Sequence, residues 1–103
     1  SGYKIEPNSS SPTGKIITQW GYGTNTSSGV AQAVVFPTTF PTAVLHVFAQ
    51  EDNPSGTWVT GMPTVHCAGD VTATGFNEYR LSWNGTAWSG GSAAAFRYIA
   101  IGN

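Results

Sequence analysis

The sequence predicts an all-β protein, a small antiparallel β-sandwich of about six to eight strands. Its apolar stretches are short, rich in Val, Ile, Thr and aromatic residues, and separated by segments rich in Gly, Pro and Asn. Helical spacing of apolar residues is not sustained for about twelve residues anywhere in the chain. The 103 residues, 40% of them hydrophobic, suffice for one domain with its own core.

The first half of the chain predicts an irregular start followed by three strands. Residues 1–13 hold Pro7, Pro12 and a run of Ser, which predicts a lead-in without regular structure before a domain at 14–103. Strands are expected at 15–20, 30–36 and 43–50, with a loop at 21–29. Both alternating faces of the third strand are mostly apolar, which predicts a central strand that is buried on both sides.

The second half predicts further short strands around one strong turn. Strands are expected at 57–61, 64–68, 76–83 and 93–101, and residues 71–74 lead into the strand at 76–83. Asn84-Gly85 is the strongest short turn signal in the sequence, and residues 88–92 predict a Gly/Ser loop. Within 76–83, strand alternation separates Phe76, Glu78, Arg80 and Ser82 from Asn77, Tyr79, Leu81 and Trp83.

Charge and cysteine content exclude several classes of partner. Four basic residues against five acidic ones leave a net charge of -1, too little positive charge to bind nucleic acid. No apolar run is long enough to span a membrane, and no signal peptide is expected. Cys67 is the single cysteine, which excludes an internal disulfide and a cysteine-based zinc cluster.

The residues that could perform chemistry do not form a catalytic pattern, so no enzyme, metal site or cofactor is expected. His66 and Cys67 are neighbours on a predicted strand, so their side chains point to opposite faces and cannot pair as base and nucleophile. Glu51 and Asp52 are adjacent in a turn-rich segment, unlike the two facing carboxylates of a glycosidase. His46, within an apolar strand, is expected in the core or at an interface.

Aromatic residues in or beside loops are the main candidates for binding. Trp58, Trp83 and Trp88 have Asn, Asp or Ser nearby in the sequence. An aromatic ring can cover the apolar face of a sugar while short polar groups bond its hydroxyls. The alternative is that these rings fill the core or join subunits.

Four segments in order resemble the C-terminal domain of tailed-phage tail fibres. They are GKIITQWG at residues 14–21, VVFPTTFPTA at 34–43, TGF at 74–76 and FRYIAIGN at 96–103. The resemblance implies a homotrimeric knob at the distal end of a virion tail fibre, joined to an upstream shaft. It also implies binding of a bacterial surface receptor, usually lipopolysaccharide or another glycan, and sometimes an outer-membrane protein.

A more distant resemblance is to H-type lectins, which share the TGF motif followed by Trp at the spacing of Phe76 to Trp83. It implies a trimeric sandwich with the sugar site near Trp83, Asn84 and the loop around Asn25. The combined candidates for glycan contact are Trp88, Asn84, Asp52, Trp58, Trp83 and Asn25. A free-standing lectin for neutral sugars, a fibre-borne depolymerase and a purely structural trimer cap are the alternatives.

Overall fold

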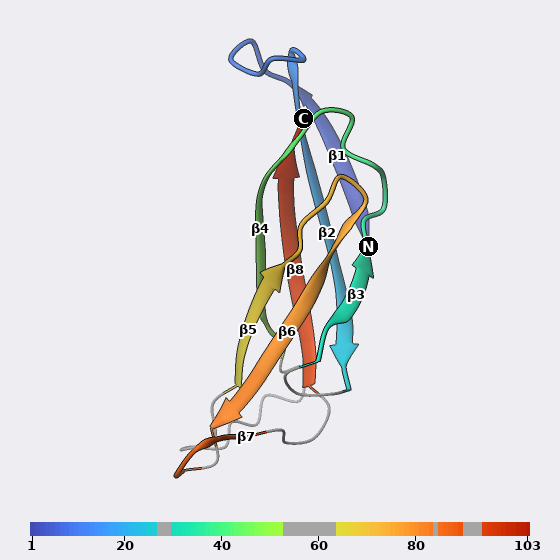
Figure 1. Cartoon of the computed structure of the whole chain (residues 1–103). Helices are drawn as coiled ribbons and strands as arrows, with labels where there is room; N and C mark the ends of the chain where they lie inside the picture. The colour runs from blue at the N-terminus through green and yellow to red at the C-terminus, as the bar shows by residue number, and fades with distance from the viewer. Residues whose placement is uncertain (27–29, 53–63, 84, 90–93) are drawn as a thin grey trace.

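The computed structural model describes residues 1–26, 30–52, 64–83, 85–89 and 94–103 (Figure 1). The regular structure in these residues consists of eight β-strands, without a helix, in two facing antiparallel sheets. Sheet A has the strand order β1 (Gly2–Pro7), β2 (Lys15–Asn25), β8 (Ala94–Gly102), β4 (Val44–Glu51). Sheet B has the order β3 (Gln32–Val35), β6 (Gly75–Trp83), β5 (Thr64–Gly69), and the short β7 (Trp88–Ser89) pairs with β6. The predicted sandwich is therefore confirmed.

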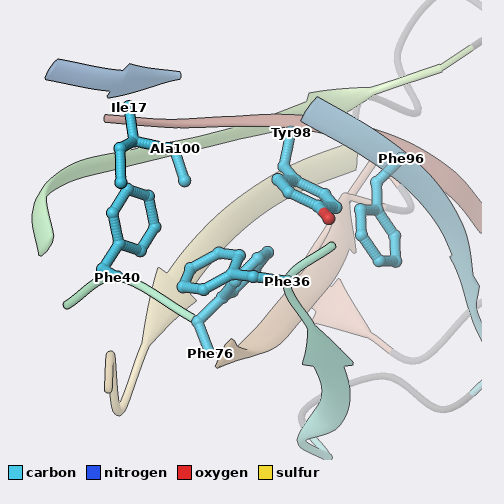
Figure 2. Packing of buried hydrophobic residues seen from close by; sticks show 7 residues of the cluster. All are labelled: Ile17, Phe36, Phe40, Phe76, Phe96, Tyr98 and Ala100. Atoms are coloured by element: carbon cyan, nitrogen blue, oxygen red, sulfur yellow. The ribbon is translucent and has the colours of Figure 1, made fainter. Parts of the chain in front are cut away.

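The core lies between the two sheets and is mostly aromatic (Figure 2). Its buried members are Ile17, Phe36, Phe40, Phe76, Phe96, Tyr98 and Ala100. The segment between β3 and β4 inserts Phe36 and Phe40, whose rings meet edge to face at 5.2 Å. The buried amide of Gln19 holds this segment, because it donates to the Thr38 carbonyl at 2.8 Å and accepts from the Thr38 amide at 2.9 Å.

Two glycines of β2 make room for the rings of β8. Gly21 lies opposite Tyr98, and Gly23 lies opposite Phe96. A Cβ atom would lie 2.6 Å from the Tyr98 side chain at the first position and 2.8 Å from the Phe96 ring at the second. Because packed interiors tolerate little added volume, glycine at these positions lets two large rings lie against the backbone of β2.

The structure corrects several predicted elements. The lead-in contains a regular strand, because β1 pairs with β2 from Gly2 opposite Trp20 to Pro7 opposite Lys15. The predicted loop at 21–29 begins later, since β2 continues to Asn25. Residues 88–89 form β7 instead of the start of a loop. In each case cross-strand pairing outweighs local Gly, Ser or Pro content. The predicted strand at 57–61 lies outside the described residues.

The strand at 44–51 is the clearest correction. It was predicted to be central and buried on both sides, but β4 is an edge strand of sheet A. Val47 and Ala49 pack against the core, whereas His46 and Phe48 point outward and are exposed. Alternation predicted Val44 on the face of His46 and Phe48, but the register shifts between Val44 and His46, and Val44 packs against the core. Apolar content also did not reveal that the outer face is uncovered in the single chain.

Candidate functional site

Most of the predicted binding residues gather at one end of the sandwich, which we call the β7 end. Strands β2, β4 and β6 end there and β5 and β8 begin there, since all pairings are antiparallel (Figure 1). This geometry brings Asn25, Asp52, Trp83 and Trp88 to the same end. Asn84 and Trp58 lie outside the described residues.

Two of the predicted tryptophans form a pair. Trp83 ends β6 and lies directly opposite Trp88 of β7. Their rings meet edge to face, with centroids 5.5 Å apart and planes at 66°. Gly85, in the connection between them, has φ of +96°, a backbone conformation that favours glycine. Trp88 is 50% exposed, so much of its indole is free to contact a ligand.

A hollow of about 380 Å³ lies beside Trp88 on the outer face of sheet B. Side chains of β5 and β6 form its walls. They belong to two neighbouring cross-strand pairs, in which Val65 lies opposite Leu81 and Cys67 lies opposite Tyr79. Val65 and Leu81 are 52% and 44% exposed, and the Cys67 thiol is also exposed. The hollow is thus an open apolar trough that one tryptophan borders.

A polar group is anchored at the margin of this hollow. The Tyr79 hydroxyl donates to Asp70 Oδ2 at 2.7 Å, and the Asn77 amide donates to the same oxygen at 3.0 Å. The Asn77 and Tyr79 hydrogen bonds lower the pKa of Asp70, and the Asp70 bond raises the pKa of Tyr79. Asp70 has φ of +49°, so its side-chain bonds also hold an uncommon backbone conformation.

Replacing Asp70 with asparagine is expected to remove one acid-sensitive contribution to stability. A carboxyl group whose pKa is lower in the folded state than in the unfolded state stabilises the fold at pH values above its unfolded pKa, which is about 3.9 for Asp. This stabilisation is lost as the pH falls through the folded-state pKa. The melting temperature of the wild type should therefore decrease more between pH 5 and 2 than that of Asp70→Asn. Glu6→Gln is the control, and identical pH profiles for wild type and Asp70→Asn would contradict the assignment.

A buried polar cluster lies inside the β7 end, between the sheets. The Asn25 amide donates to Glu78 Oε2 at 2.6 Å, and His66 Nδ1 bonds Glu78 Oε1. Arg80 Nε donates to the Asn25 carbonyl at 3.2 Å. Glu78 and Asn25 are 0% and 1% exposed, and Arg80 is 1% exposed. The structure thus places Asn25 in the interior, where it joins the ends of β2 and β6.

Sequence reasoning missed this cluster, although a signal for it was present. Alternation put Glu78 and Arg80 on the same face of the strand as Phe76, which is buried. His66 Nδ1 is hydrogen-bonded to Glu78, and the buried Nε2 of the same ring has no hydrogen bond within the described residues. His66 and Cys67 do point to opposite faces, as predicted: the His66 side chain is buried and Cys67 is exposed.

Asp52 makes an ion pair on the other side of the molecule. Its Oδ2 lies 3.0 Å from Arg97 Nε, on the outer face of sheet A. The Asp52 side chain is 20% exposed and that of Arg97 is 64% exposed. Asp52 therefore has a partner within the chain, on the opposite sheet from the hollow beside Trp88.

The described residues contain no group of three His, Cys, Asp or Glu side chains that could hold a metal ion. No helix in the same part of the chain is long and apolar enough to cross a membrane.

Fold and topology together define an all-β antiparallel sandwich domain with exposed aromatic residues on both outer faces. The family model for the C-terminal region of gp53-like tail fiber proteins matches residues 10–103. The chain therefore belongs to this family, and the resemblance predicted from its four motifs is confirmed. No curated protein matches its sequence.

Two solved structures share the fold over 100% of this chain. One is a C-terminal part of the R1 pyocin fiber of P. aeruginosa, with a TM-score of 0.64 and 22% identity. The other is an N-truncated R1-type pyocin tail fiber, with a TM-score of 0.64 and 21% identity. The chain spans 28% of the length of the first and 87% of the second. At these identities the likeness establishes the fold.

Proposed function

We propose that this domain is the receptor-binding tip of a tail fibre and that it binds a glycan on a bacterial surface, such as lipopolysaccharide. The observation that carries the proposal is the half-exposed Trp88 beside an apolar hollow of about 380 Å³. Pockets that hold small ligands have volumes of roughly 300–1,000 Å³ and mostly apolar walls. Membership of a tail-fibre family supports the bacterial surface as the location of the ligand.

The chemistry of the hollow suits a ring with one apolar face and a hydroxylated edge. The Trp88 indole, together with Val65 and Leu81, offers apolar contact to the C–H face of a sugar. At the margin, Tyr79 and Asn77 both use Oδ2 of Asp70, which leaves Oδ1 to accept from a sugar hydroxyl. Neutral polar and aromatic contacts of this kind match a chain with only 9% charged residues.

The proposed tip works as a homotrimer and without catalysis. Three copies give three identical sites, so weak binding at each site becomes strong attachment through effective concentration. The hollow is lined by Val, Cys, Tyr, Arg, Leu and Trp side chains, and none of these residues supplies the carboxylate pair of a glycosidase. Binding alone is therefore the activity that this surface supports.

A thiol label at Cys67 tests the hollow directly, because Cys67 is the single cysteine and is exposed in its wall. The purified protein is expected to bind intact cells of a susceptible strain, and less to cells with truncated lipopolysaccharide. Modification with a bulky maleimide should reduce that binding at least tenfold. Cys67→Ser treated with the same maleimide is the matched control and should keep binding. Full binding by the labelled wild type would refute the proposed site.

A further inference from the structure

The outer face of sheet A carries an apolar surface that the single chain leaves uncovered. Its centre is one cross-strand row, in which Trp20 of β2, Ile99 of β8 and Phe48 of β4 lie side by side. These side chains are 43%, 48% and 58% exposed. A contiguous apolar patch on a soluble domain marks a surface of interaction. We call this surface the Ile99 face.

Contacts within the chain hold the rings of this face in place. The Trp20 indole lies over Gly2 of β1, where an added Cβ would come within 2.8 Å of the ring. The His46 ring lies against the Phe48 ring, with centroids 4.0 Å apart. Rings that are already ordered lose less side-chain entropy when a partner covers them.

The charged side chains of the Ile99 face are neutralised within the chain. Lys4 Nζ lies 3.2 Å from Glu6 Oε1, and Arg97 Nε lies 3.0 Å from Asp52 Oδ2. The Lys, Arg, Asp and Glu side chains of this face are thus two cations and two anions, joined in two pairs. Around a symmetry axis each group approaches its own copies, so an unpaired charge would meet like charge and repel. A face with internally paired charges avoids this cost, which favours a copy of the same chain as its partner.

Strand β1 shows a second uncovered surface next to this face. Tyr3 and Ile5 point to the core side of sheet A, opposite the buried Gln19 and Ile17. They are nevertheless 51% and 50% exposed. Apolar side chains are therefore exposed at this edge of sheet A as well, beside the Ile99 face, where a neighbouring chain could cover them.

We infer that copies of this chain associate through the Ile99 face. The inference rests on the proposed homotrimeric tip and names the surface that builds it. The four strands lie about 4.8 Å apart and have six to eleven residues each, so at about 3.3 Å per residue they give a face of roughly 20 by 27 Å. The uneven surface of the side chains adds to this area. The total accessible area of the face then approaches the roughly 800 Å² that each partner contributes to a standard protein–protein interface. The hollow beside Trp88, on the opposite sheet, then stays open to a receptor.

A charge placed at the centre of the face tests the inference. Sedimentation equilibrium of the wild type is expected to give an integral multiple of the monomer mass. Ile99→Lys puts a cation beside its own copies and should raise the concentration for half-assembly at least tenfold. Circular dichroism reports whether the variant is folded, and Phe48→Ser gives a second variant if it is not.

Leu81→Lys is the matched control, because Leu81 is 44% exposed at the centre of the other outer face, against 48% for Ile99. It should assemble like the wild type. A monomeric wild type at all concentrations, or a folded Ile99→Lys that assembles normally, would overturn the inference and assign the face to another partner. An assembled protein that does not bind cells would refute the proposed receptor function and leave this inference standing.

Discussion

Replacing Trp88 with alanine is expected to weaken receptor binding at each site by about 30-fold, which corresponds to about 2 kcal/mol for an aromatic residue at the centre of a contact. The side chain is half exposed on a strand of only two residues, so its removal takes away ligand contact and little core packing. Because several sites bind together, adsorption of whole fibres should fall by more than this factor. Isothermal titration with isolated lipopolysaccharide and a cell adsorption assay measure the two effects.

Two further variants serve as comparisons for Trp88→Ala. Trp88→Phe keeps an aromatic face and should recover part of the affinity. Val35→Ala removes methyl groups from a side chain that is 79% exposed on β3 and should leave binding unchanged. If Trp88→Ala binds like the wild type while its circular dichroism and mass are unchanged, the receptor contacts lie elsewhere on the domain.

Replacing Glu78 with alanine is expected to destabilise the fold by about 2–6 kcal/mol, because two buried polar side chains, Asn25 and His66, lose the hydrogen bond to its carboxyl group, and a buried hydrogen-bonding group without that partner costs about 1–3 kcal/mol. Glu78 accepts from Asn25 of β2 and is hydrogen-bonded to His66 of β5, so its loss removes the group that joins β2, β5 and β6. Total stabilities of small domains are about 5–15 kcal/mol, so this variant should unfold at much lower urea concentration.

The control for this experiment is Glu6, a glutamate of the same chain that is exposed instead of buried. Glu6 is 55% exposed and pairs with Lys4 on the surface, so Glu6→Ala should cost about 0–1 kcal/mol. Both variants are compared with the wild type at one protein concentration, since assembly would itself add stability. Equal urea midpoints for the two variants would show that the cluster does not hold the β7 end together.

The alternation of side chains predicted which residues of a regular strand share a face, because a strand presents successive residues to opposite faces until a bulge interrupts it, as between Val44 and His46 in β4. It separated Glu78 and Arg80 from Tyr79 and Leu81 correctly. It also placed His66 and Cys67 on opposite faces. These predictions depend on geometry within one strand, which the order of residues specifies.

The candidate site was predictable only in part. The turn signal at Asn84-Gly85 predicted that the chain reverses after Trp83, and pairing then sets Trp83 opposite Trp88. The cluster around Glu78 was not predictable in the same way, because Asn25 is 53 residues away along the chain. No local pattern indicates which distant amide will satisfy a buried carboxylate.

The sequence by itself determined an all-β chain, the faces of its strands and its tail-fibre family, since these follow from local periodicity and short ordered motifs. The tertiary structure decided that β4 lies at an edge and that β1 belongs to the sheet. It also decided that Asn25 is buried and that Asp52 lies on the opposite sheet from Trp88. These features depend on which strands pair, and pairing is fixed by contacts between residues far apart in the chain.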